Sequence, residues 1–479
     1  MKFKILIISL LIAIINTAAG QNSDIKKLLK SASKGDAQAQ YDLAKRYYKG
    51  DGVEKDCNKT IEWLQKSANQ GNVKAQFSLG IHYENGDCVL KNIENAVKWY
   101  QKAADQGYAK AQVKMGFYYS TGTCVEKNYN KAAEYYQQAA NQENTSALCY
   151  LGICYEFGNG VPKDQRKAIE LYEQAANKGY APAQYCLGNC YSFGNGVSID
   201  YNKSLEWYEK AANQGHAIAQ YNIGMQYYYG QGVTKDSTKA TEWIQKAANQ
   251  GLPQAQFFMG NCFYYGNNGY DIDYQKAFEL FKKAAEQGNS DAQLQMGYCF
   301  KNGYGTERNY TKAAECFEKA AATGNILAQV ALGSVYLKGE GVERNPYKAV
   351  EWFEKAGNQG NLEAQLILAV LYHAGDGIPK DINKWIEWTT KAAYQGDLSS
   401  QIMLGGYYMT KADFPQSIHW FRKSANQGDA YSLYALGWCY YKGYGVTEDY
   451  EQAVKLFKGA ASKGCKEAID QLKVLKIKY

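Results

Sequence analysis

Apolar residues recur along this chain in a pattern that repeats about every 36 residues. Counted from a glycine at the head of each repeat, alanine usually falls at offset +4, Leu, Ile or Met at +8, and often tyrosine at +12. This spacing, close to 3.6 residues, predicts a helix. A K-A-x-x-W-Y-x-K-A-A segment predicts a second helix in the same repeat. The G-x-G-V sequence between them predicts a turn, because glycine accepts positive φ, and an Asp or Asn near +21 is the expected N-cap of the second helix.

The head glycine marks the repeats and gives their number. A fixed period of this length indicates a solenoid, in which each unit packs on its neighbours. We therefore expect an all-α fold of about twelve repeats and a closing helical segment. Glu143 replaces the glycine once, and the other heads are Gly35, Gly71, Gly107, Gly179, Gly215, Gly251, Gly288, Gly324, Gly360, Gly396, Gly428 and Gly464.

A further glycine lies inside the first predicted helix, at offset +9, in ten of the repeats. Glycine costs a helix about 1 kcal/mol relative to alanine. Its repeated use indicates that another helix packs against this backbone. We expect the alanines at +32 and +33 of the second helix to be the partners.

The pattern A-x-A-Q-x-x-L-G-x-x-Y-x-x-G-x-G-V-x-x-D-x-x-K-A-x-x-W-Y-x-K-A-A-x-Q-G resembles the Sel-1-like repeat family, a relative of the tetratricopeptide repeat. The resemblance covers about residues 34–475. It implies a right-handed α/α superhelical solenoid of about twelve 36-residue helix-turn-helix repeats. It also implies a scaffold that binds other proteins or peptides on a concave surface lined by the first helices.

The ends of the chain differ from the repeats. Residues 1–20 have two lysines, an apolar run over 5–15 and small residues at the end, which predict a secretory signal peptide; a signal anchor is the alternative. Residues 21–34 are expected to cap the first repeat through Ile25, Leu28 and Leu29. The solenoid then spans 35–463, and 464–479 form a C-terminal capping helix and tail.

Charge, motifs and histidines favour neither nucleic-acid binding nor catalysis. The net charge is +7 without a long basic run. The four histidines fall at unrelated offsets, and no H-E-x-x-H, G-x-S-x-G or P-loop motif occurs. We expect no enzyme activity, cofactor, metal or nucleic-acid partner, and no stable membrane insertion after signal cleavage. The alternative function is a secreted hydrolase acting on cell-wall glycan or a β-lactam.

The twelve cysteines fall into groups. Cys154, Cys190, Cys262, Cys299 and Cys439 share offset +11, where other repeats have apolar residues, and are interpreted as buried free thiols. Cys88 and Cys124 each replace the second glycine of a G-x-G-V loop, and Cys57 begins a second helix in the same region. A disulfide among these three is one interpretation, and three unpaired loop cysteines are the other. Candidate glycosylation sites in N-x-[ST] sequences are Asn58, Asn144, Asn202 and Asn309.

One face of the first helix is left free by the core, because offsets +3, +7, +10 and +14 fall together at 100° per residue. The residue at +14 is aromatic in four successive repeats. One interpretation is that these rings cover the adjacent turn; the other is a surface for an extended peptide, with asparagine amides that bond its backbone. The candidate surface consists of Tyr150, Phe157, Asn189, Phe193, Asn222, Met225, Tyr229, Phe258, Asn261 and Tyr265, with Ile153 beside them.

The expected function is a non-enzymatic scaffold or adaptor of the secretory pathway or the cell exterior. The resemblance implies two versions of it. One is a soluble protein of the endoplasmic reticulum lumen that presents misfolded proteins for degradation. The other is a secreted, periplasmic or extracellular bacterial repeat protein that contacts host factors.

Overall fold

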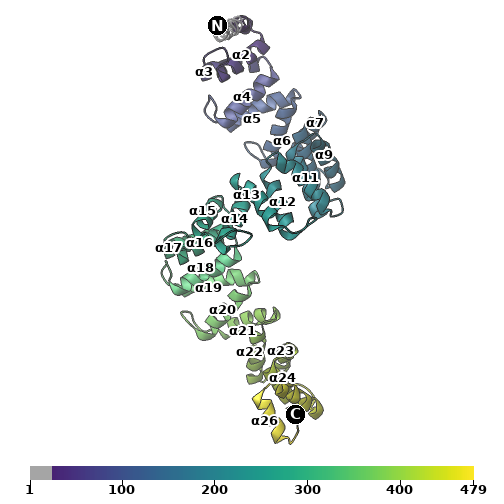
Figure 1. The fold of residues 1–479 in the computed structure, drawn as a ribbon, viewed down its shortest axis with the longest axis vertical. Coiled ribbons are helices and arrows are strands. Elements are labelled where there is room, and N and C mark those ends of the chain that lie inside the picture. The colour runs from purple at the N-terminus through teal and green to yellow at the C-terminus, as the bar shows by residue number, and fades with distance from the viewer. Residues whose placement is uncertain (1–23, 479) are drawn as a thin grey trace, which may run out of the picture. The chain divides into compact units, whose positions relative to one another are not determined.

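The computed structural model describes residues 24–478, so the predicted signal peptide lies outside the described residues. Within this range the only regular elements are helices, which confirms the all-α prediction (Figure 1). Residues 24–33 are helical. The helices that follow are α2 (Ala37–Lys49), α3 (Cys57–Asn69), α4 (Val73–Asn85), α5 (Ile93–Asp105), α6 (Ala109–Thr121), α7 (Tyr129–Ala140), α8 (Thr145–Phe157), α9 (Gln165–Asn177), α10 (Ala181–Phe193), α11 (Tyr201–Asn213), α12 (Ala217–Tyr229), α13 (Ser237–Asn249), α14 (Pro253–Tyr265), α15 (Tyr274–Glu286), α16 (Ser290–Asn302), α17 (Tyr310–Ala322), α18 (Ile326–Lys338), α19 (Pro346–Asn358), α20 (Leu362–Ala374), α21 (Ile382–Tyr394), α22 (Leu398–Thr410), α23 (Phe414–Asn426), α24 (Ala430–Lys442), α25 (Tyr450–Ser462) and α26 (Lys466–Val474).

The chain divides into two compact units between Gln250 and Gly251. The first contains α2–α13 and the second α14–α26. In both, the two helices of a repeat pack against each other, and the second helix also packs against the first helix of the next repeat, as α9 does with α8 and α10.

Turns and caps fix where the helices begin and end. The second helix usually starts after an Asp or Asn at +21; the Asp164 side chain, for example, accepts a 3.0 Å hydrogen bond from the Lys167 N–H. This satisfies a backbone donor that has no partner inside the helix, and it confirms the predicted N-cap. The first helix usually ends at a left-handed glycine such as Gly158, at φ 75°.

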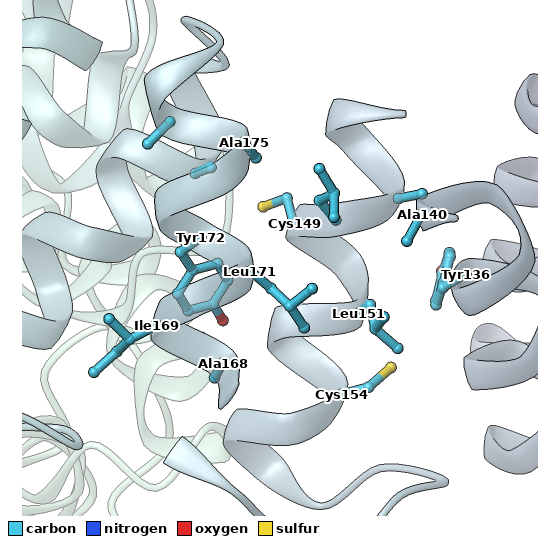
Figure 2. Packing of buried hydrophobic residues seen from close by; sticks show 14 of the residues in the cluster. Tyr136, Ala140, Cys149, Leu151, Cys154, Ala168, Ile169, Leu171, Tyr172 and Ala175 are labelled. Carbon is cyan, nitrogen blue, oxygen red and sulfur yellow. The ribbon is translucent and has the colours of Figure 1, made fainter. Parts of the chain in front are cut away.

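The glycine at +9 lies against a large side chain, so the expectation that alanines at +32 and +33 are its partners was wrong. A Cβ added at Gly80 would lie 2.6 Å from the Tyr100 ring, and one at Gly405 would lie 2.6 Å from the Phe421 ring. This large residue directly follows the tryptophan position of the second helix. Figure 2 shows two such rings, Tyr136 and Tyr172, on either side of α8.

Paired glutamines join consecutive helices. Gln40 donates its amide to the Ala32 carbonyl at 3.0 Å and accepts a 2.7 Å hydrogen bond from Gln70. The first glutamine lies at offset +5 and the second at the end of the second helix. The buried amide of Gln40 thus has a partner for its N–H group and another for its oxygen. The same pairing recurs at Gln106–Gln76, Gln142–Gln112, Gln214–Gln184, Gln250–Gln220, Gln287–Gln256, Gln359–Gln329, Gln395–Gln365 and Gln427–Gln401.

Both ends of the repeat array are covered by apolar side chains. Ile25 is buried, and Leu28 and Leu29 pack against the core of the first repeat, as the sequence predicts. At the other end, α26 buries Ala468 and Leu472 against α25.

Candidate protein-binding surface

Three exposed aromatic side chains form what we call the aromatic row: Phe157, Phe193 and Tyr229 of the first unit. They are the last residues of α8, α10 and α12. Their exposed fractions are 65%, 67% and 61%. Most of each side chain is therefore accessible to a partner. In the second unit Tyr265 has the same offset at the end of α14 and is 56% exposed.

The scaffold places these rings without needing them. Each one precedes the left-handed glycine that ends its helix, such as Gly194 after Phe193, at φ 75°. The glycine N–H bonds the Cys190 carbonyl, so the cap is a backbone feature. At the same offset α2 has Lys49 and α6 has Thr121, and both helices end at glycine in the same conformation.

The other candidate residues of α8, α10 and α12 are partly committed to packing. Tyr150 is half-buried and stacks on Tyr136, with ring centroids 5.2 Å apart. Asn189 accepts a 2.7 Å hydrogen bond from the Tyr208 hydroxyl, and this bond does not use its two amide N–H groups. Asn222, Met225 and Ile153 are half-buried.

In the second unit, α14 carries three candidates. Phe258 and Asn261 are half-buried, whereas Tyr265 is exposed and packs edge-on against Tyr264 at a centroid distance of 4.8 Å. The Asn261 Oδ1 atom is buried without a hydrogen-bond partner among the described residues. The Asn261 oxygen is therefore not available to accept a hydrogen bond from a bound peptide, because it is buried.

Sequence analysis missed a half-buried polar cluster around Glu84. Its carboxylate binds Lys114 Nζ at 2.8 Å and accepts hydrogen bonds from the Tyr100 and Tyr118 hydroxyls at 2.5 and 3.0 Å. Burial opposes ionisation of Glu84, but the hydrogen bonds from Lys114 and the two tyrosines outweigh it and hold the carboxyl pKa below its usual value. Burial and this carboxylate raise the pKa of both tyrosines. The sequence contained one signal for this cluster: Glu84 is an acidic residue in the last turn of α4, the first helix of its repeat.

The loop cysteines are in two states. Cys57 and Cys88 form a disulfide with Cα atoms 4.9 Å apart, while Cys124 is exposed and free. Both Cys88 and Cys124 have positive φ, the conformation of the glycine that they replace. Elsewhere this glycine packs on the start of the preceding second helix, as Gly232 does on Tyr201. For Cys124 the residue equivalent to Cys57 is Ile93, so no thiol is available there.

The cysteines at offset +11 are buried and free, as the sequence predicts. Burial raises the pKa of Cys154 to about 11 and that of Cys190 to about 12. These thiols stay protonated at neutral pH and are poor nucleophiles.

The four N-x-[ST] asparagines differ in accessibility. Asn58 and Asn202 are exposed in the first turns of α3 and α11. Asn144 and Asn309 are half-buried N-caps, and their side chains accept hydrogen bonds from the backbone N–H groups of Ala147 and Lys312.

Residues 24–478 contain neither a cluster of metal-ligating side chains nor a helix of membrane-spanning character. Within that range no three His, Cys, Asp or Glu side chains come together as a metal site. None of the helices described there has the length and apolar character needed to cross a membrane.

Comparison with known proteins agrees with the architecture. The Sel1 repeat family model matches twelve consecutive segments: 37–72, 73–108, 109–144, 145–180, 181–216, 217–252, 253–289, 290–325, 326–361, 362–397, 398–429 and 430–465. No curated protein matches the chain.

Two of the solved structures similar to this chain come from bacteria. A protective antigen of uropathogenic Escherichia coli strains, described as displaying an SLR fold, is 32% identical; the alignment covers 94% of this chain and 90% of that one, with a TM-score of 0.58. A Sel1 repeat protein from Oxalobacter formigenes is 33% identical over 65% of this chain and 90% of that one, with a TM-score of 0.47.

Proposed function

Because the chain belongs to the Sel1 repeat family, we propose that it is a non-enzymatic scaffold that holds an extended segment of another protein against the aromatic row. The single observation that supports this most is the exposure of Phe157, Phe193 and Tyr229, at 65%, 67% and 61%. Aromatic residues exposed at one position of consecutive repeats give a recurring apolar surface, and apolar surface patches often mark interaction sites.

The chemistry of the row suits an unfolded segment. Aromatic side chains contribute strongly to protein interfaces, because they bury much apolar surface with few rotatable bonds. Rings at one offset in consecutive repeats provide equivalent subsites for side chains along an extended peptide. The amide N–H groups of Asn189 lie one helical turn before Phe193 and are suited to donate to a peptide carbonyl.

The proposed location is outside the cytoplasm, in the secretory pathway or beyond the cell. The Cys57–Cys88 disulfide is compatible with an oxidising compartment, and the N-terminal sequence has the pattern of a signal peptide. Mass spectrometry of the protein from its native source separates the two versions. Glycans on the exposed Asn58 and Asn202 indicate passage through the endoplasmic reticulum, where a role in protein degradation is a candidate. Their absence, with a mature N-terminus near residue 21, favours a bacterial exported protein.

A matched pair of variants tests the proposed surface. Phe157→Ser with Phe193→Ser removes two rings of the row. Tyr347→Ser with Tyr450→Ser removes two rings that are 60% and 53% exposed on second helices of the other unit. Each protein is titrated against a library of fluorescent unstructured peptides, and circular dichroism verifies the fold.

We expect the row variant to keep its helicity and to lose at least about tenfold in affinity, because truncating an aromatic anchor costs about 2 kcal/mol or more. The control variant should bind like wild type. Unfolding of the row variant contradicts the proposal, since the rings would then be structural, and so does unchanged binding.

A further inference from the structure

A cavity of about 490 Å³ lies in the second unit between α15 and α17, above α16. This volume is in the range of small-molecule sites. Its apolar part is formed by Phe278, Met296 and Phe300, and the α17 side contributes Cys316 and Lys319. The cavity arises because several features of the repeat are missing at this one place.

The first missing feature is a tryptophan. Cys316 occupies the position that is tryptophan in most repeats, and it is 5% exposed. In the neighbouring repeat, Trp352 packs back against the core of α17 and α18, and in the first unit Trp207 packs in the same way on α9 and α10. The corresponding ring from α17 would lie over α15 and α16, where the cavity is found.

The second feature is a cation without its ring. In seven repeats the lysine three residues after the tryptophan lies over the indole, at distances from 3.7 Å for Lys210 to 5.6 Å for Lys423. Lys319 is the equivalent residue of α17; it lines the cavity and acts electrostatically on Cys316. Among the described residues Lys319 lies over no aromatic ring, because position 316 is a cysteine. The remaining pairs are Lys66–Trp63, Lys102–Trp99, Lys246–Trp243, Lys355–Trp352 and Lys391–Trp388.

The third feature is an unpaired hydrogen-bond acceptor. Gln293 is the glutamine at offset +5 of this repeat and donates to the Ala285 carbonyl at 3.2 Å. The glutamine that should donate to its Oε1 atom is replaced by Thr323, whose hydroxyl instead donates to Ala320 at 2.7 Å. The Gln293 Oε1 atom is therefore buried with no partner among the described residues, which is costly, and Gln293 lines the same cavity.

We propose that this cavity binds a tryptophan side chain from a partner polypeptide, whose indole takes the place that the chain's own tryptophans fill in other repeats. An indole meets all three needs. Its ring fills the apolar volume against Phe278, Met296 and Phe300, its face receives the Lys319 ammonium, and its N–H is a donor for Gln293 Oε1. The proposal rests on the proposed function only in taking the partner to be a polypeptide, since the site is separate from the aromatic row.

The probe is N-acetyl-tryptophanamide, titrated into the full protein by saturation-transfer NMR and calorimetry. We expect a millimolar dissociation constant, as is usual for one side chain. N-acetyl-leucinamide should bind at least about tenfold more weakly, because it offers neither ring nor donor. The 1-methyltryptophan analogue should bind about threefold to tenfold more weakly, because it lacks the N–H for Gln293 and one hydrogen bond contributes about 1 kcal/mol.

Two variants locate the site. Cys316→Trp fills the cavity with a ring of the chain itself and should abolish binding without lowering the melting temperature. Leu456→Trp is the matched control: it places a new ring at the equivalent repeat position of α25, outside the cavity lining, and should bind like wild type. Should Cys316→Trp fail to fold, Thr323→Gln decides, because it supplies the missing donor to Gln293 and should remove the preference for tryptophanamide over the methyl analogue.

Several results overturn the proposal: no binding of tryptophanamide to wild type, equal binding of the leucine probe, or undiminished binding to a folded Cys316→Trp protein. Loss of the two rings of the aromatic row should leave tryptophanamide binding unchanged. A failure at either surface is therefore distinguishable from a failure at the other.

Discussion

The neighbouring glycines Gly405 and Gly406 of α22 allow the close contact inside each repeat to be measured within one helix. Replacing a helical glycine by alanine normally stabilises a protein by about 1 kcal/mol, because alanine has the higher helix propensity. A Cβ at Gly406 would find no atom within 4 Å. Gly406→Ala should therefore show this gain in full.

At Gly405 the same methyl group meets Phe421. Its Cβ would lie 2.6 Å from two ring carbons, whereas carbon atoms in favourable contact are about 3.5–4.0 Å apart. The Phe421 side chain is 1% exposed, so a shift of the ring requires other packed groups to move with it. Overpacking of this kind costs about 1–3 kcal/mol, which cancels or exceeds the propensity gain. Gly405→Ala should thus lie about 1–3 kcal/mol below Gly406→Ala in stability.

The assay is urea denaturation of wild type and both variants, followed by far-ultraviolet circular dichroism. Because repeat proteins unfold partly repeat by repeat, hydrogen exchange of α22 and α23 should accompany it and show faster exchange for Gly405→Ala only. If both variants gain equally in stability, the packing of Phe421 against the α22 backbone is wrong.

Three further changes have defined outcomes. Reducing the Cys57–Cys88 disulfide, which closes 31 residues, should lower the unfolding free energy of the first unit by about 3–4 kcal/mol in the chain-entropy description, as measured by denaturation with and without reductant. Ile93→Cys should form an equivalent disulfide with Cys124, so thiol titration of the oxidised variant should find one free thiol fewer than in wild type; a new exposed thiol contradicts the equivalence. Glu84→Gln should cost about 1–3 kcal/mol at neutral pH. Since the folded pKa of Glu84 lies below its ordinary value of 4.5, its ionised form stabilises the protein above that pH, and the difference between variant and wild type should shrink as pH falls through the folded pKa.

The fold could be predicted from the sequence because the same helix and turn signals recur in each repeat. Apolar period, capping Asp and turn glycine agree in repeat after repeat, so single departures such as Glu143 did not obscure the helices. The N-cap at +21 could be predicted for the same reason, because it depends only on neighbours along the chain.

Contacts between helices were harder to predict. The glycine at +9 was identified as a close contact, but its partner was assigned to alanines, because spacing alone does not give the rotation of one helix against another. The structure places a ring such as Phe421 there instead. The cavity at Cys316 was missed for a related reason. A cysteine at that position is informative only once the direction of the equivalent tryptophans is known.

The candidate surface was predicted in part. The shared offset +14 identified the exposed residues Phe157, Phe193 and Tyr229. The last residue of a helix beside a glycine turn has few neighbours, so its exposure can be predicted from the repeat pattern. The asparagines were less predictable, since Asn189 is held by the Tyr208 hydroxyl, a contact between residues 19 apart in sequence.

Site-specific photo-crosslinking tests the central claim most directly. A photoreactive phenylalanine analogue is placed at Phe193, and in a control protein at Tyr347, which is comparably exposed at 60%. Each protein is irradiated with the tightest peptide from the library titration, and the products are identified by mass spectrometry. The account predicts efficient cross-linking from position 193 and background levels from position 347. Cross-linking from 347 with none from 193 would contradict it, because the peptide would then bind away from the aromatic row.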